Sequence, residues 1–301
     1  MRNITFLVAI AISLSIKAQN NNPIIDAPHY YTADPSPHTW VNDDTLYMYC
    51  TYDVPGNSDE VEWHVFSTTD LEHWTDHGCA LHLNDINWAV RKAWAPDCAM
   101  RNGKYYFYYP ARLDSATGGM NTGVAVSNSP VGPFTEAIGK PLMLRAHDPC
   151  VFEDDDGSYY LYTQKNMAKL NEDMISFAEE PRRIELLGHE IPKKYEAVWV
   201  FKRGDMYYWI IAEHFNEFTY WMGDNPYGPF TYTGILMKGT GKGNNHPGII
   251  NYKGKWLLFY HNYVETNGKG AARRIHAEEM HFNEDGTIQE VLRTKEGVRL
   301  H

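Results

Sequence analysis

Five polar side chains, each placed at the start of a short apolar segment, are the residues in this sequence best suited to chemistry. They are Asp34, Asp97, Asp148, Glu196 and His246, at spacings of 63, 51, 48 and 50 residues. Carboxyl and imidazole groups are the side chains that most often transfer protons in enzymes. Glu196 is the least expected, because it opens "YEAVWVF", an apolar, β-branched run where an ionisable carboxyl is costly unless paired. An aspartate before proline can simply make a turn, but the recurrence of the pattern favours a shared site.

The five residues open five similar units. Each unit has a polar residue, a short apolar strand, a turn rich in Gly, Asp, Asn or Lys, and a second strand heavy with aromatic residues. Several units continue into further strand signals, as in "GVAVSNSPVGPFTEA". Periods near fifty residues are typical of propellers and solenoids. The units begin "ADPSPHTW", "APDCAMRN", "HDPCVFED", "YEAVWVFK" and "NHPGIINY".

These signals predict an all-β, five-bladed β-propeller with four-stranded antiparallel blades, as a single domain over residues 19–301. The only helix candidate, "MAKLNEDMISFAEE" at 167–180, is expected to be a strand followed by a loop. The first strand of each propeller blade lines the central channel. We therefore expect the five opening residues to converge at one mouth of that channel.

The first eighteen residues indicate the compartment. Arg2, the apolar "ITFLVAIAISLSI" and Ala18 ahead of Gln19 are typical of a signal peptide that is cleaved near Ala18. The apolar run is short for a membrane span, and no cysteine lies beside the cut to accept a lipid. We expect an exported protein without a membrane anchor, periplasmic or extracellular, and a monomer.

The composition narrows the class of ligand. A net charge of −11 with 27 Lys and Arg argues against nucleic acid or an anionic membrane as partner. The 9 Trp and 21 Tyr suit a hydroxyl-rich ligand, because aromatic rings stack on sugars, although they also build cores. The cysteines are scattered and are expected to be buried thiols, with one or two disulfides as the alternative that export permits. They are Cys50, Cys79, Cys98 and Cys150.

The motifs together resemble the five-bladed propeller glycoside hydrolases of family 43, which include β-xylosidases, α-L-arabinofuranosidases and endo-arabinanases. The resemblance covers nearly all of the chain after the signal segment. It is carried by "ADPS", "WAPD", "HDP", "YEA", "NHPG" and the closing "RRIHAEEMHFNEDGTI".

The resemblance implies catalytic roles for three carboxyl groups. Asp34 matches the general base, Glu196 the general acid, and Asp148 the residue that orients the acid and modulates its pKa. In an inverting glycosidase the acid and base stand roughly 6.5–9.5 Å apart, to leave room for the attacking water. Glu196 must stay protonated near neutral pH, although an ordinary Glu has a pKa of about 4.3. Burial and the charge of Asp148 are expected to raise that pKa.

The resemblance also implies substrate-binding residues. Trp94 matches an aromatic wall beside the terminal sugar, with a place in the core as the alternative. Arg273 matches an arginine that reaches the substrate and the acid pair, while Arg274 should face the other way on the strand. Tyr263 is a pocket candidate by location.

His246 matches a histidine on the channel axis near a hydrated calcium. No cofactor is required, and a structural calcium that His246 contacts through water is the alternative to a simple turn role, since calcium prefers oxygen ligands. We expect Asp97 to be structural, because a fourth carboxyl at the mouth would add repulsion. Arg91 and His214 are weaker pocket candidates.

The prediction is an inverting exo-glycosidase that releases terminal pentose from arabinose- or xylose-containing glycans, with α-L-arabinofuranose preferred. The long segments "DVPGNSDEVEW" and "HLNDINWAVRKAW" favour exo action, because they can close one end of a groove. The alternatives are a β-D-xylosidase, an endo-arabinanase, a related phosphorylase, and a carbohydrate-binding propeller that does not cut, since a fold alone does not fix function.

Overall fold

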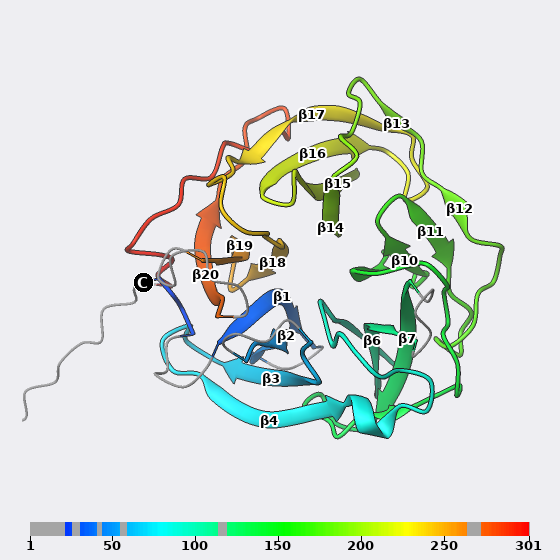
Figure 1. The fold of residues 1–301 in the computed structure, drawn as a ribbon. Coiled ribbons are helices and arrows are strands. Elements are labelled where there is room, and N and C mark those ends of the chain that lie inside the picture. Colours follow the sequence, from blue (N-terminus) through cyan, green and yellow to red (C-terminus); the bar gives the residue numbers. More distant parts are fainter. Residues whose placement is uncertain are drawn as a thin grey trace, which may run out of the picture.

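The computed structural model describes residues 22–25, 31–40, 44–54, 59–113, 119–263 and 272–300. The predicted signal segment lies outside these residues. Within them the chain is almost entirely β-structure, and five sheets are set around a common axis (Figure 1). This arrangement is the five-bladed β-propeller that the repeat predicts.

The first three blades are four-stranded antiparallel sheets, as expected. The only helix in the described residues is one turn of 3-10 helix, Leu83–Asp85. The strands of blade one are β1 (Thr32–Thr39), β2 (Leu46–Tyr52), β3 (Glu62–Thr68) and β4 (Thr75–His82); those of blade two are β5 (Asp97–Arg101), β6 (Lys104–Arg112), β7 (Met120–Ser127) and β8 (Thr135–Glu136); those of blade three are β9 (Pro149–Glu153), β10 (Tyr159–Thr163), β11 (Asn166–Lys169) and β12 (Arg182–Arg183).

The last two blades depart from the four-strand expectation. Blade four has a fifth strand, because the short β13 pairs in parallel with the outer strand β17. Blade five has three strands in the described residues. Blade four consists of β13 (Leu186–Leu187), β14 (Tyr195–Arg203), β15 (Met206–Glu213), β16 (Glu217–Gly223) and β17 (Phe230–Met237), and blade five of β18 (Gly248–Tyr252), β19 (Lys255–Asn262) and β20 (Arg274–Met280).

Residues 22–25 lie along the outer edge of blade five, where a fourth strand would pair. The Ile24 N–H donates to the Ile275 carbonyl at 2.8 Å, and the Asn22 amide accepts from the Ala277 N–H at 2.9 Å. Unpaired backbone groups at a sheet edge are costly when buried. This segment therefore satisfies part of the edge of β20.

The inner strands form a closed ring around the channel. Each packs against the next in the order β1, β5, β9, β14, β18 and back to β1 (Figure 1). The step from β18 to β1 is especially close, since a Cβ on Gly248 would lie 2.3 Å from the Pro35 carbonyl oxygen. Only glycine permits that approach, which explains the "NHPG" motif at this position.

The apolar core lies between the blades. One hydrophobic cluster fills the space between blades one and two, another that between blades two and three, a third spans blades three to five, and a fourth joins blades five and one. Fully buried aromatic rings such as Trp63, Tyr108 and Trp209 supply much of this packing. Most of the aromatic residues counted in the sequence therefore serve the core.

One local prediction, for residues 167–180, is confirmed. The segment "MAKLNEDMISFAEE" gives the end of β11 and then a loop. The acidic run at 153–157 is the turn between β9 and β10, where the Gly157 N–H donates to the Asp154 carbonyl at 2.9 Å. Lys202 neutralises Asp154 and Asp155 at 2.9 and 2.8 Å.

Candidate active site

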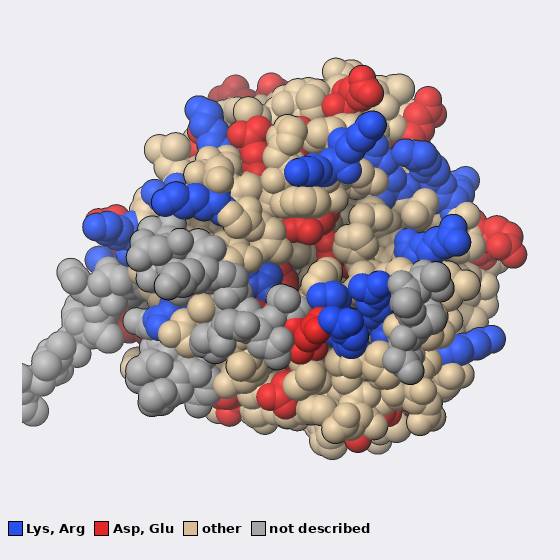
Figure 2. Space-filling view, viewed as in Figure 1, with Lys and Arg blue, Asp and Glu red and all other residues tan. Residues whose placement is uncertain are grey.

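A pocket of about 190 Å³ opens at one mouth of the channel. Figure 2 shows acidic side chains inside a hollow at the centre of this face, with Lys and Arg side chains around it. All seven predicted site residues line the pocket, and three more residues join them. The predicted ones are Asp34, Trp94, Asp148, Glu196, His246, Tyr263 and Arg273, and the additional ones are Glu60, Ala95 and Asn244.

The three catalytic candidates sit where the inner strands begin, but Glu196 is not at the same position as the aspartates. Asp34, Asp148 and Ala197 share a left-handed backbone, with φ of 55°, 52° and 64°. The pairing irregularity after Ala33 in β1 also matches the one after Glu196 in β14. Glu196 therefore lies one residue earlier than the repeat implies. Bulges of this kind re-aim side chains near active sites, and here one lets a longer acid reach the pocket.

The Asp34 carboxylate is held ionised by its surroundings. Arg273 Nη1 donates to Oδ1 at 3.1 Å and Thr51 Oγ1 donates to Oδ2 at 2.6 Å. Burial alone would raise the pKa of Asp34, but the charge of the Arg273 guanidinium outweighs it and holds that pKa far below its usual range. Asp34 is thus a permanent carboxylate, as a general base requires.

His261 contacts the backbone of Asp34. The Asp34 backbone N–H donates to His261 Nδ1 at 3.0 Å, while Nε2 lies 3.1 Å from the Asn244 carbonyl oxygen. Burial lowers the pKa of His261. The ring is therefore neutral, with its proton on Nε2, where it donates to Asn244.

The Glu196 carboxyl has the opposite environment. Burial, then the charge of Asp148, then that of Asp34 raise the pKa of Glu196 well above its ordinary value. Its Oε1 atom is buried and has no hydrogen-bond partner among the described residues. A neutral carboxylic acid is the form that this site favours.

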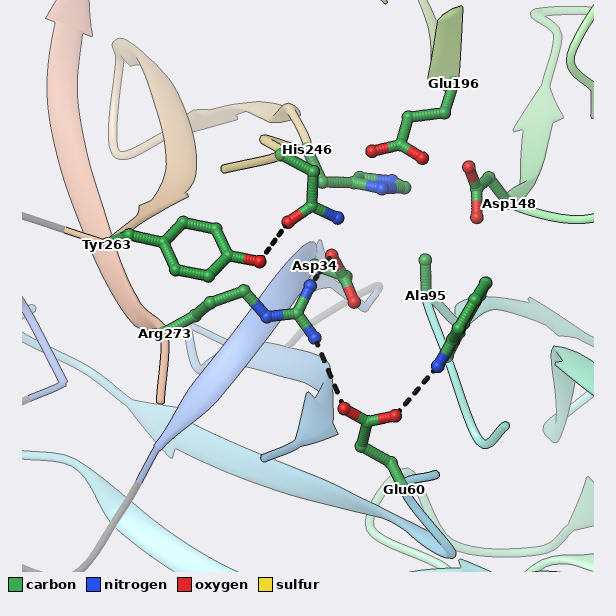
Figure 3. A pocket seen from close by; sticks show the side chains of 10 residues that line it. Asp34, Glu60, Ala95, Asp148, Glu196, His246, Tyr263 and Arg273 are labelled. Atoms are coloured by element: carbon green, nitrogen blue, oxygen red, sulfur yellow. Dashed lines mark hydrogen bonds and ion pairs between the residues drawn. The ribbon is translucent and has the colours of Figure 1, made fainter. Parts of the chain in front are cut away.

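Asp148 contacts the strand that carries the acid. Its Oδ2 atom accepts a 2.9 Å hydrogen bond from the Ala197 backbone N–H, and His147 Nε2 lies 3.7 Å away. Figure 3 shows the Asp148 and Glu196 carboxyls next to each other on one side of the pocket. Asp148 is therefore placed both to fix the start of β14 and to act electrostatically on Glu196.

Arg273 connects the base to the pocket wall. Its Nε and Nη2 atoms donate to the buried Asp53 carboxylate at 2.9 and 2.7 Å, and Nη2 lies 4.0 Å from Glu60 Oε1. A guanidinium held on two sides has one fixed geometry. Arg274, the next residue, instead lies over the Tyr31 ring, as the strand alternation predicts.

Trp94 forms one wall of the pocket. Its Nε1–H donates to Glu60 Oε2 at 2.8 Å, and the Lys92 ammonium lies 4.5 Å from its ring centroid. Trp94 is half-exposed, so it is a pocket residue and not part of the core. On the opposite side, the Tyr263 hydroxyl donates to Asn244 Oδ1.

Asp97 does not line the pocket, so the expectation that all five opening residues converge there is wrong for it, and its contacts are structural, as expected. It is fully buried, and its Oδ1 atom lies 2.6 Å from Ser36 Oγ and 2.7 Å from His38 Nε2, both in blade one. Its Oδ2 atom accepts from the Val151 N–H in blade three. One carboxylate therefore ties three successive blades together.

His246 is buried at the pocket, and the described residues offer little for a metal. No group of three or more His, Cys, Asp or Glu side chains within the described ranges is arranged to hold an ion. Calcium takes 6–8 oxygen ligands, and one imidazole does not supply them. A calcium that His246 contacts through water is not tested by this set of side chains and stays a prediction.

The remaining sequence predictions have mixed outcomes. Arg91 pairs with Asp59 on the surface, and His214 is an exposed turn residue, so neither lines the pocket.

Cys50, Cys98 and Cys150 are buried free thiols, whereas the prediction is wrong for Cys79, which is exposed and also free. In the outer strand β4, exposed positions alternate with partly buried ones from Thr75 to Cys79, and Cys79 falls on the solvent side. Among the described residues, no helix is long and apolar enough to cross a membrane.

The site contains polar residues that the repeat does not reveal. Glu60 lies in a loop of blade one, and Asn244 precedes the fifth inner strand. Asp53 directly follows β2, and His261 lies in β19. The one usable signal for Glu60 is its place in "DVPGNSDEVEW", a segment already expected to close the groove.

Comparison with known proteins agrees with this geometry. The model of the glycosyl hydrolases family 43 matches residues 21–288. A xylosidase/arabinosidase of Bacteroides ovatus is 32% identical, over 87% of this chain and 95% of its own. Xylosidase/arabinosidase 43A of Humicola insolens is 33% identical, over 86% and 96%.

A solved structure extends the likeness to the fold. It is that of a β-xylosidase/α-arabinofuranosidase from a compost microbial metagenome, in complex with xylotriose, and it is 34% identical with a TM-score of 0.81, over 90% of this chain and 97% of that one. With a family match over most of the chain, a shared propeller and a pocket of paired carboxyls, this protein is a glycoside hydrolase and belongs to glycosyl hydrolases family 43.

Proposed function

We propose that this enzyme is an inverting exo-glycosidase that releases terminal pentose, α-L-arabinofuranose or β-D-xylose, from xylan- or arabinoxylan-type glycans. The observation that carries the mechanism is the contrast between two carboxyls in one pocket. Arg273 holds Asp34 ionised, whereas burial and Asp148 favour the protonated form of Glu196. This is the division of charge that acid–base catalysis of glycoside hydrolysis needs.

In the proposed mechanism the protonated Glu196 carboxyl gives its proton to the leaving glycosidic oxygen. The Asp34 carboxylate takes a proton from a water on the opposite face of the sugar, and that water attacks the anomeric carbon. Asp148 keeps the pKa of Glu196 high and fixes its strand, and no covalent intermediate forms.

The size and walls of the pocket support exo action. A volume of about 190 Å³ is below the roughly 300–1,000 Å³ of pockets for drug-sized ligands, which suits one sugar ring. The Ala93 N–H donates to the Glu60 carbonyl at 2.8 Å, which joins the two segments expected to close the groove. An endo-acting enzyme would need the groove open on both sides.

The activities for which the similar proteins are named support a pentose substrate. The Bacteroides ovatus and Humicola insolens proteins and the compost enzyme are each named for both xylose- and arabinose-releasing activity. Our preference for α-L-arabinofuranose rests on the sequence resemblance, and the two sugars present hydroxyls so similarly that pocket details decide between them.

A substrate screen tests the proposal. Aryl α-L-arabinofuranoside, β-D-xyloside and β-D-galactoside should be compared by kcat/KM, and release of pentose but not galactose is expected. Proton NMR of the first-formed sugar should show the inverted anomer. Initial retention would reject the mechanism, and a requirement for phosphate would indicate a phosphorylase. Export of a monomer stays a prediction, which fractionation and light scattering would check.

A further inference from the structure

Two basic side chains, Lys165 and Arg183, lie near the start of the strand that carries Glu196, outside the pocket lining itself. Lys165 is half-buried and Arg183 is exposed, and neither forms an ion pair in the part of the chain that the structure describes. Other cations around this mouth do pair: Lys92 with Asp59 at 3.0 Å, and Arg273 with Asp53.

The strand register places both cations at the catalytic mouth. Thr163, at the end of β10, pairs with Pro149, the residue after Asp148. The turn that follows therefore lies at the same end of the blade as the catalytic aspartate. A contact of 3.1 Å between Gln164 Nε2 and His147 Nε2 confirms this.

The neighbouring strand brings Arg183 to the same place. Asn166 pairs with Arg183, and the Ile184 N–H donates to the Lys165 carbonyl at 2.8 Å. The Lys165 ammonium lies 5.0 Å from the ring centroid of Tyr195, the residue directly before Glu196. Figure 2 shows basic side chains beside the central hollow on the side of β11 to β13.

The positive charges of Lys165 and Arg183 repel each other in the free enzyme. Burial, and then the charge of Arg183, lower the pKa of Lys165. The charges of Glu190 and Glu213 oppose this lowering only in part, and Glu213 contacts His189 at 2.9 Å. An anion bound between the two cations would relieve their repulsion.

This position has a defined relation to the proposed reaction. The general acid faces the leaving oxygen, so the part of the glycan that departs lies on the Glu196 side of the pocket. The half-exposed Tyr195 ring next to Glu196 offers a flat apolar surface for that sugar. Lys165 and Arg183 would then face its substituents.

We propose that Lys165, Arg183 and Tyr195 form a leaving-group subsite for a sugar that carries a carboxylate, such as a uronic acid substituent. The inference rests on the proposed function, because it needs cleavage with Glu196 as the acid. It predicts a preference for acidic over neutral decoration of the sugar next to the scissile bond.

The test compares two oligosaccharides that differ only in charge. Each has the terminal pentose that the aryl screen shows to be released, and its penultimate sugar carries either a glucuronosyl group or the same group with its carboxyl reduced to the alcohol. We expect kcat/KM to be about tenfold higher for the acidic one, as for a charge-assisted contact. Adding about 0.5 M salt should reduce the ratio, because salt screens the interaction between the cations and the carboxylate.

Variants assign the preference to residues. Lys165→Met with Arg183→Met should bring the ratio close to one, whereas Lys238→Met, an exposed lysine paired with Glu290 after β17, should keep it. A wild-type ratio near one, or a high ratio that survives the double variant, would overturn the subsite. Failure to cleave any aryl pentoside would instead reject the proposed function.

Discussion

The Asp148 carboxylate accepts a 2.9 Å hydrogen bond from the backbone N–H of Ala197, the residue that directly follows Glu196. One carboxylate thus both fixes the backbone next to the acid and raises the pKa of that acid through its charge. The two effects can be separated, because an asparagine at this position can still accept the hydrogen bond but carries no charge.

Asp148→Asn should shift the pH dependence of the reaction. Glu196 is active while protonated, so kcat falls as pH rises through its pKa. Removing the Asp148 charge lowers that pKa, and the alkaline limb of the kcat profile should move to lower pH. A full pH profile on an aryl pentoside measures this. Asp148→Ala, which also loses the backbone contact, should lose more activity, and an unmoved alkaline limb in Asp148→Asn would contradict the electrostatic role.

Glu196→Ala should make the rate depend on the leaving group. Loss of a general acid costs about 10²–10⁴-fold, so an alkyl pentoside should be cleaved at a rate near background. An activated aryl pentoside needs less protonation and should retain much more of its rate. Near wild-type rates on the alkyl substrate would remove Glu196 from the acid role.

Asp34→Asn provides the matched comparison for the acid variant. Loss of the base is not compensated by a better leaving group, so both substrates should lose activity together. The fold should persist, because Arg273 keeps its contacts with Asp53, and circular dichroism checks this. A selective recovery on the activated substrate would contradict the assignment of Asp34 as the base.

Glu196→Gln should stabilise the protein near neutral pH. The folded-state pKa of Glu196 is raised, so wild-type stability falls as pH rises above the unfolded value of about 4.3. The amide avoids this cost. The melting temperature of the variant should exceed that of the wild type by roughly 2 °C or more at pH 7, with a smaller difference at pH 4. An equal difference at both pH values would show that ionisation is not the cause.

Trp94→Phe should weaken substrate binding without removing the aromatic face. The variant loses the 2.8 Å hydrogen bond to Glu60, so the ring is no longer fixed. We expect KM for an aryl pentoside to rise several-fold and kcat to change little, since the wall binds the ground state and the transition state alike. Trp94→Ala should raise KM further, by about tenfold. A wild-type KM in Trp94→Phe would show that the bond to Glu60 is not needed.

The residues that the sequence predicts best are those that the repeat keeps in phase. Asp34 and Asp148 could be found because a short polar–apolar–turn pattern recurs with each blade, and the propeller then brings its first strands together. Glu196 is found by the same pattern, yet its position is offset by one residue because a bulge follows it. Register within a strand depends on backbone geometry that apolar alternation does not show.

The residues that the sequence does not predict depend on loops and on contacts between blades. Glu60 contacts Trp94 and Arg273, which belong to two other segments of the chain. Neither contact corresponds to a recurring spacing in the sequence. The positions of the parallel strand β13 and of residues 22–25 likewise depend on their pairing with the outer strand of a blade. Such pairings join residues far apart in sequence, where local pattern carries no information.

The buried Asp97 carboxylate joins blade one, which carries Asp34, to blade three, which starts at Asp148. A buried residue outside the pocket thus helps to fix Asp34 relative to Asp148. The loop that carries Glu60 takes no part in these contacts. Exchange of such loops could therefore give the scaffold new substrates while these two carboxylates keep their relative positions.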